Sequence, residues 1–140
     1  MTAQIHELLR LDGDWTSMAC DPGLPASHPR IAEASEAKRR AAPSILFSTA
    51  CWRNYRGSWE IAGKRFSLLA LEGRYELIGG EPLFAEWFSG ELVVPRGEVI
   101  RYVHMGFASV FEEEVRIVVA QGIESSRRLI DNRGRKGDPR

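Results

Sequence analysis

Cys51 and His104 are the residues of this chain whose types could support nucleophilic catalysis. A thiol becomes a nucleophile when a nearby imidazole and a carboxylate stabilise its thiolate form. Glu86, Glu91 and Glu98 are the carboxylates that could complete such a set. His104, however, lies in the alternating stretch YVHMGF, where a single histidine is usually a hydrogen-bonded structural residue. We therefore rank a Cys/His-dependent hydrolase third among the hypotheses and expect binding instead of catalysis.

The remaining polar residues do not form a pattern typical of a metal or acid–base site. His6, His28 and His104 share no spacing that would place two of them on one strand or helix face, and the chain has no CxxC motif. In a strand over residues 112–114, Glu112 and Glu114 would face solvent and only Glu113 would share a face with the apolar residues. We expect no metal and no cofactor.

Aromatic and arginine side chains are concentrated around residues 52–56 and 84–88. If FAEWF forms a strand, Phe84 and Phe88 lie on the opposite face from Ala85 and Trp87, so one set is exposed. An exposed aromatic patch beside arginines is typical of a protein-binding surface. The candidate contact residues are Trp52, Arg53, Tyr55, Arg56, Phe84, Trp87 and Phe88.

Composition narrows the class of protein. The 140 residues have the size and the 44% hydrophobic content of one globular domain. Nineteen basic residues balance 19 acidic ones, so no overall field favours nucleic acid as a partner. No signal peptide and no apolar run of about 20 residues is present, so neither export nor membrane insertion is expected. Cys20 and Cys51 are too few for a disulfide framework, and a cytoplasmic protein with free thiols is predicted.

The elements that would position these residues are mostly strands. The DGD sequence at residues 12–14 predicts a turn between two short N-terminal strands. Residues 21–29 contain three prolines and predict a loop, and the alanine-rich stretch at about 30–41 predicts one surface helix that ends before Pro43. From Gly57 onward, period-two alternation separated by turns predicts strands in SWEIA, RFSLLAL, RYELI, FAEWF, ELVV, VIRYVHM and VFEEEVRIVVA, with a last edge strand in IESSRRLI.

These strands indicate an α+β domain that is predominantly antiparallel β. We expect a β-meander that closes to an open barrel or a sandwich, with the one surface helix outside it. The domain is predicted to span residues 1–130, and the polar, charged residues 131–140 are predicted to be a disordered tail.

Two resemblances add to this interpretation. The stretch from Gly57 to Trp59 resembles the Gly-x-Trp opening of lipocalin-like barrels, which implies a tryptophan at the base of a cup for an apolar ligand. The stretches ACWR-x-Y, WFSGEL and YVHMGF resemble those of a group of small bacterial proteins of unknown function, over about residues 49–112. That resemblance implies a bacterial, cytoplasmic origin and no catalytic residue.

The first hypothesis for function is a non-enzymatic, cytoplasmic protein-interaction module, such as an immunity or accessory protein. The alternative is a small lipocalin-like barrel that binds an apolar small molecule. A protein partner is expected, a small-molecule ligand is the second choice, and no oligomeric state is predicted.

Overall fold

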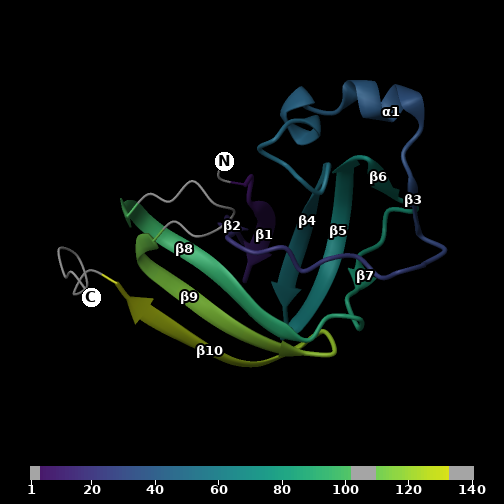
Figure 1. The fold of residues 1–140 in the computed structure, drawn as a ribbon. Helices are drawn as coiled ribbons and strands as arrows, with labels where there is room; N and C mark the ends of the chain where they lie inside the picture. The colour runs from purple at the N-terminus through teal and green to yellow at the C-terminus, as the bar shows by residue number, and fades with distance from the viewer. Residues whose placement is uncertain (1–3, 102–109, 133–140) are drawn as a thin grey trace.

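The main feature of the fold is one strongly curved, eight-stranded sheet (Figure 1). The computed structural model describes residues 4–101 and 110–132. The path along the sheet is β2-β1-β4-β5-β10-β9-β8, and a short β7 pairs with β5. The strands are β1 (Glu7–Leu11), β2 (Asp14–Met18), β4 (Tyr55–Ala62), β5 (Arg65–Gly73), β7 (Leu83–Phe84), β8 (Gly90–Arg101), β9 (Val110–Ala120) and β10 (Ile123–Asp131).

Antiparallel pairing dominates the sheet, which confirms the predicted fold class. Strands β8, β9 and β10 form a continuous antiparallel meander. The exception among the described strand pairs is β1, which runs parallel to β4, with Leu8 opposite Ser58. The N-terminal hairpin therefore joins the sheet through a strand much later in the sequence.

Three hairpins are closed by two-residue turns, two of them at the turn signals DGD and AGK. Both central residues of each turn have positive φ: Asp12 and Gly13, Gly63 and Lys64, and Gln121 and Gly122. Such turns follow the right-handed twist of the flanking strands, and glycine adopts the left-handed conformation without steric cost.

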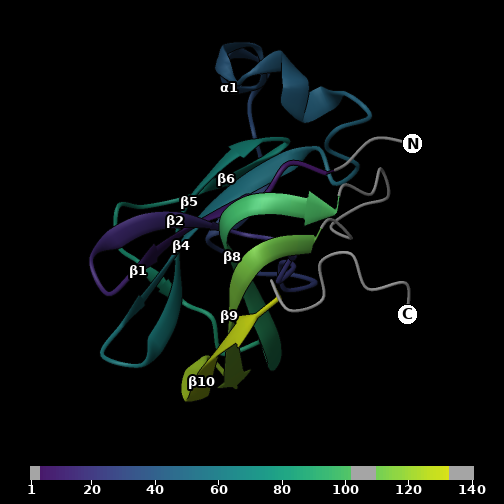
Figure 2. The ribbon, with the colours of Figure 1, turned by 90° about the vertical axis from the view of Figure 1, so that its left-hand side faces the viewer.

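The sheet curls without closing into a complete barrel (Figure 2). Its end strands are joined by a hydrogen bond from the Ala19 N–H, just after β2, to the carbonyl of Val93 in β8. On the other side, β5 pairs with β10 only at Arg65 and Ile123. This arrangement corresponds to the open form of barrel expected from the strand pattern.

Side chains fill the space that the curved sheet encloses. Trp59 is fully buried and stacks on Phe66, with ring centroids 4.9 Å apart. Alternating residues of the strands surround this pair, as period-two patterning requires. The fully buried apolar residues include Leu9, Met18, Ile61, Leu68, Leu92, Val94 and Ile117.

The predicted helix at 30–41 is too long. Residues Ile31–Glu33 form strand β3, which pairs with β6 (Tyr75–Leu77) in a separate two-stranded sheet. Helix α1 spans only Glu36–Ala41. It begins there because the Ser35 hydroxyl accepts a hydrogen bond from the Lys38 N–H and so caps the first turn. Ala42 is extended, as expected for a residue that precedes proline.

Two strand predictions are also corrected. FAEWF is not a strand beyond Phe84: the chain turns, with the Phe88 N–H donating to the carbonyl of Ala85. The turn places Trp87 against Trp59 and Phe88 against Phe66, so both rings pack on the core. The stretches ELVV and VIR belong to one strand, β8, with Pro95 tolerated because β8 lies at a sheet edge.

The folded domain extends slightly beyond residue 130. Asp131 is the last residue of β10, and Asn132 is buried with its side-chain amide donating to Glu114. The rest of the predicted tail, residues 133–140, lies outside the described residues. Within the part of the chain that is described, no helix is long and apolar enough to cross a membrane.

Candidate functional site

The candidate functional site is the segment 44–54, which we call the anchored loop. It begins with a short 3-10 helix, η1 (Ser44–Phe47), whose Leu46 is fully buried. The Ser48 hydroxyl donates to the carbonyl of Ile45 and accepts from the Ala50 N–H, at 2.7 and 3.2 Å. Asn54 ends the loop with a φ of 61°, a conformation that asparagine tolerates better than most residues. Local hydrogen bonds therefore define the shape of the loop.

Gln4 holds the loop against the N-terminal segment. Its side-chain oxygen accepts from the Trp52 N–H at 2.6 Å, and its amide nitrogen donates to the carbonyl of Thr49 at 2.9 Å. The Ile5 N–H adds a bond to the carbonyl of Ala50 at 2.8 Å. Because Gln4 is buried, these bonds are shielded from competition by water.

Glu7 forms the centre of a buried polar cluster next to the loop. Its fully buried carboxylate accepts hydrogen bonds from the Arg53 Nε and Nη2, at 3.1 and 2.7 Å. The Gly57 N–H and the Trp59 indole N–H donate to the same carboxylate, at 2.9 and 3.0 Å. Arg53 also donates to the carbonyl of Ile5 at 3.0 Å. The cluster joins β1, the anchored loop and β4.

Burial dominates the electrostatics of this cluster. It raises the pKa of Glu7, while Arg53 and the donors from Trp59 and Gly57 act in the opposite direction. Burial also raises the pKa of Tyr55, whose hydroxyl donates to Asp21 at 3.2 Å. Each of these groups already has a partner within the protein, so the cluster acts as a brace for the loop.

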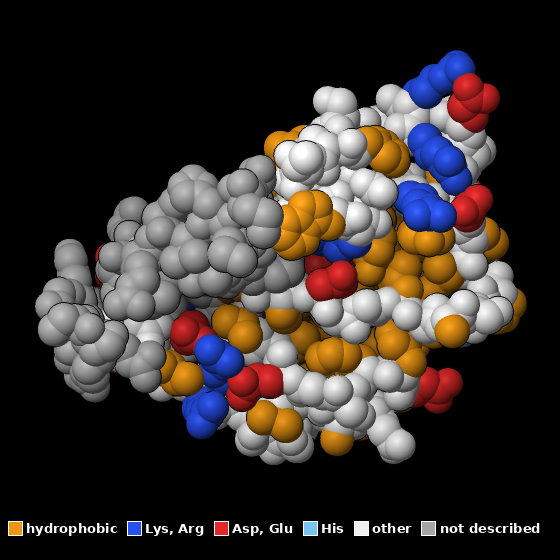
Figure 3. Space-filling model, viewed as in Figure 1, with side chains coloured by type: hydrophobic (Ala, Val, Ile, Leu, Met, Phe, Trp, Pro, Cys, Tyr) orange, Lys and Arg blue, Asp and Glu red, His pale blue; other side chains and the backbone are white. Residues whose placement is uncertain are grey.

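The anchored loop carries three exposed apolar side chains. Ile45, Phe47 and Trp52 have exposed fractions of 50%, 44% and 55%. Hydrophobic side chains are visible at the surface of this part of the molecule, beside the helical segments (Figure 3). A rigid backbone thus presents a large aromatic residue to solvent.

Both thiols are at least partly buried, Cys51 more than Cys20. Cys51 is fully buried, and its Sγ lies 3.3 Å from the carbonyl of Tyr55, to which it can donate. Burial raises the pKa of Cys20 to about 11. His104 lies outside the described residues, so its pairing with Cys51 stays a prediction.

Most of the predicted contact residues near residue 52 are internal. Arg53 and Tyr55 belong to the buried cluster, and Arg56 is half-buried and ion-paired with Glu72 at the edge of β5. Trp52 is the member of this group whose side chain is mostly exposed. Arg53 therefore supports the loop, whereas Arg56 links β4 to β5.

The predicted contact residues near residue 86 are half-buried against the core. Phe84 lies under the Arg65 guanidinium, 4.0 Å from its centre. The Trp87 indole N–H donates to the carbonyl of Gly23, and Phe88 contacts the ring of Phe66. Trp87 and Phe88 therefore do not join Trp52 in one exposed patch.

Histidines and carboxylates are dispersed over the described part of the chain, where no three of the side chains that commonly ligate metals are clustered. His6 lies 3.2 Å from the Ser17 hydroxyl, and burial lowers its pKa. The Nδ1 of His28 accepts from the Arg30 N–H. Both imidazoles have structural contacts.

Sequence reasoning missed Glu7 and Gln4, which hold the anchored loop in place. The alternation of β1 does place Glu7 on the same strand face as the buried Leu9 and Leu11. A carboxylate on an apolar strand face is buried and so requires a hydrogen-bonding or charged partner. This requirement could have identified Glu7 as the centre of a polar cluster.

Comparison of the chain with protein-family models, with curated proteins and with solved structures finds no match in any of the three.

Proposed function

We propose that this chain is a non-enzymatic protein-binding module whose contact surface is centred on Trp52. One observation carries the proposal: the Trp52 side chain is 55% exposed although the backbone around it is fixed. The buried Gln4 accepts a hydrogen bond from the Trp52 N–H, and the buried Glu7 is ion-paired with the neighbouring Arg53. Solvent-exposed tryptophan is uncommon in a monomer, and tryptophan is among the residues most often found at binding hot spots.

Preorganisation explains how so small a surface can bind. A tryptophan hides about 150–250 Å² when a partner covers it. A loop that is already ordered loses little conformational freedom on binding, so more of this gain remains as affinity. Ile45 and Phe47 are also exposed and lie on the same loop as Trp52. A partner with an apolar pocket would fit this surface.

The bacterial, cytoplasmic setting and the more specific assignment to immunity or accessory proteins are part of this proposal. The lipocalin-like alternative has less support, because Trp59 and Phe66 occupy the interior in which a small ligand would lie.

The test is affinity capture from an extract of the organism that encodes the protein, with wild type, Trp52→Ala and Trp15→Ala as baits. Trp15 is the matched control, because it is 56% exposed on β2, where the Arg10 guanidinium lies 5.8 Å from its ring. A protein retained by wild type and Trp15→Ala but lost by Trp52→Ala supports the proposal. Equal retention by all three baits, or a small molecule in native mass spectra with no protein retained, contradicts it.

A further inference from the structure

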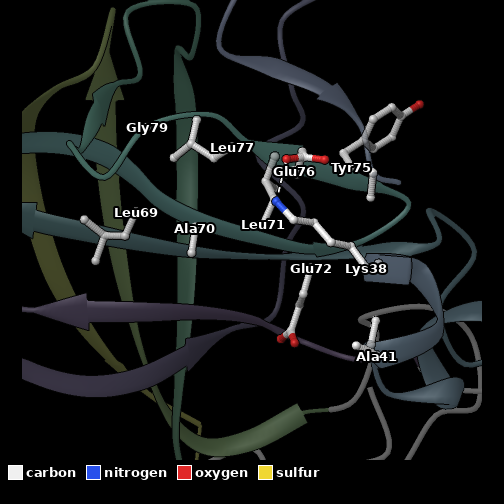
Figure 4. A pocket seen from close by; sticks show the side chains of 13 residues that line it. Lys38, Ala41, Leu69, Ala70, Leu71, Glu72, Tyr75, Glu76, Leu77 and Gly79 are labelled. Carbon is white, nitrogen blue, oxygen red and sulfur yellow. Dashed lines mark hydrogen bonds and ion pairs between the residues drawn. The ribbon is translucent and has the colours of Figure 1, made fainter. Parts of the chain in front are cut away.

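Strand β10 has one edge with no strand beside it after its first residues, within the part of the chain that the structure describes. β5 meets this edge only at Ile123, and β7 takes the next places along β5, opposite Ser67 and Leu68. Further along β5, Leu69 and Ala70 line a groove that β6 and α1 border (Figure 4). β5 therefore diverges from β10, which lies along the lower margin of the sheet in Figure 1.

The register of β10 determines which of its backbone groups point away from the sheet. The Asn132 N–H donates to the carbonyl of Glu112 in β9. Because N–H and C=O groups alternate in direction along a strand, the even-numbered residues back to the β-bulge also face β9. Arg127, Leu129 and Asp131 therefore direct their N–H and C=O groups outward, where a further strand could bind.

An apolar row of the core runs out to this edge. Val94 of β8 lies opposite Val115 of β9, and Val115 lies opposite Leu129. Val94 is fully buried and Val115 is 7% exposed, whereas Leu129 is 61% exposed. Directly opposite residues of a sheet share a face, so Leu129 continues the core face of the sheet without a strand to cover it. A strand edge with an exposed apolar centre is a template for pairing with another chain.

Opposite charges flank Leu129 on the same strand face. Arg127 precedes it by two residues and Asp131 follows it by two. Ion pairs with Glu124 and Asp12, at 2.8 and 2.6 Å, hold the Arg127 guanidinium along this face. If two copies of β10 pair antiparallel with Leu129 opposite itself, each Arg127 lies opposite the Asp131 of the other copy. Opposite charges in directly opposite positions stabilise a strand pair.

The neighbouring registers that also match the outward backbone groups are less favourable. A pair centred on Arg127 or on Arg128 would place two copies of the same cation opposite each other. A pair centred on Ile130 would place Leu129 opposite Asp131. The sequence of β10 is therefore complementary to itself about Leu129, which favours a second copy of this chain as the occupant of the edge.

We propose that the outer edge of β10 is the interface of a two-fold symmetric dimer, in which β10 pairs antiparallel with β10 of a second copy about Leu129. Arg127, Leu129 and Asp131 of the two copies exchange about six backbone hydrogen bonds, and the two sheets become continuous. A single strand pair is a small interface, so the dimer is weak and depends on protein concentration. This inference does not depend on the function proposed for Trp52.

Sedimentation velocity of the full chain, from about 1 to 500 µM, tests whether the dimer forms. The samples are wild type, Leu129→Lys and Ile78→Lys; Ile78 is the matched control, because it is 48% exposed and lies outside the strands of the curved sheet. We expect the mean mass of wild type to rise toward that of a dimer. Leu129→Lys should raise the Kd at least about tenfold, because two ammonium groups would oppose each other, and Ile78→Lys should change it less than about twofold.

Urea unfolding at about 1 µM, where the dimer is dissociated, checks the fold of both variants. The two lysine variants should unfold within about 0.5 kcal/mol of wild type, because both sites are exposed.

Cysteine crosslinking tests the register. In a hydrogen-bonded antiparallel pair the two Cα atoms of residue 129 lie about 5.5 Å apart, a distance that a disulfide can span. Ser126→Cys is the matched control on the same strand, because the two copies of residue 126 would be about 20 Å apart in this register. Wild type controls for the native Cys20 and Cys51.

Under mild oxidation we expect Leu129→Cys to form a disulfide-linked dimer at least about tenfold faster than Ser126→Cys or wild type, with the linked peptide identified by mass spectrometry. Three results would overturn the proposal: a wild-type protein that stays monomeric at about 500 µM, a dimer that Leu129→Lys does not weaken, or equal rates of crosslinking at residues 126 and 129.

Discussion

Replacing Arg53 with methionine should remove the cation that faces the buried Glu7 carboxylate. Glu7 is fully buried and the Arg53 side chain is only 9% exposed, so solvent cannot replace the lost charge. Loss of one partner from a buried ion pair typically costs about 3–5 kcal/mol. We expect a destabilisation in that range for Arg53→Met, measured by urea unfolding followed by tryptophan fluorescence near pH 7.

The pH dependence separates this electrostatic cost from a packing defect. Burial raises the pKa of Glu7 above its ordinary 4.5, and removal of Arg53 should raise it further. Below the raised pKa, Glu7 is protonated in the folded protein and needs no cation. The cost of Arg53→Met should therefore be largest at neutral pH and shrink as the pH falls toward 4.5.

The double variant Glu7→Gln with Arg53→Met provides the control. It removes both charges and leaves an amide oxygen that can accept from the Trp59 indole N–H. It should be more stable than Arg53→Met at neutral pH, with a smaller pH dependence. A cost of Arg53→Met below about 1 kcal/mol, or one that is equal at pH 5 and pH 7, would refute the argument that the pair is electrostatically coupled in the interior.

Three further predictions concern the core and the thiols. Gly57→Ala should destabilise the protein by about 1–3 kcal/mol in urea unfolding, because a Cβ there would lie 2.6 Å from the Trp59 Nε1 and 2.7 Å from the Glu7 Oε1. The control is Gly80→Ala, where a Cβ would have no atom within 4 Å, and it should change the stability by less than about 0.5 kcal/mol. Leu68→Ala, at a fully buried site, should cost about 2–5 kcal/mol, whereas Leu129→Ala, at a site 61% exposed, should stay within about 0.5 kcal/mol; similar costs for both would contradict the burial described here. Cys20 and Cys51 should react with iodoacetamide near pH 7 more slowly in the folded protein than in urea, because burial raises the pKa of Cys20 to about 11 and encloses Cys51. Rapid reaction of either thiol in the folded protein would contradict this prediction and would favour the Cys/His-dependent hydrolase.

Local features of the fold could be predicted because their causes are local. The turns at Asp12 and Gly13 and at Gly63 and Lys64 follow from residues that adopt positive φ between alternating strands. The inward alternation of Val115, Ile117 and Val119 follows from the two-residue period of a strand.

Features that depend on distant partners could not be predicted in this way. Ile31 lies opposite Leu77 in a strand pair, which removes the first residues of the predicted helix. The turn after Phe84 is favoured because the rings of Trp87 and Phe88 meet Trp59 and Phe66 in the core. In both segments, the free energy gained by packing side chains in the folded protein outweighs the local preference of the sequence for a helix or a strand.

Among the candidate contact residues near residue 52, Trp52 is the one whose side chain is mostly exposed. Tyr55 and Arg53 were grouped with it because aromatic and basic residues occur together in many interfaces. Their actual contacts are with Asp21 and Glu7, more than thirty positions away in the sequence. A one-dimensional pattern does not distinguish an arginine that faces solvent from one that neutralises a buried carboxylate.

The parallel pairing of β1 with β4 affects the order in which the chain can fold during synthesis. Arg10 of β1 is ion-paired with Glu60 of β4, fifty positions later. The N-terminal hairpin leaves the ribosome first, yet β4, which pairs with β1 on the side away from β2, is translated only after residues 19–54. Closing so long a loop has a high entropic cost, whereas β9 and β10 meet across the two-residue turn at Gln121 and Gly122, and β8 and β9 are close together in the sequence. The C-terminal meander can therefore form soon after it has been translated. The apolar face of the first hairpin, in contrast, stays exposed to water until β4 has left the ribosome.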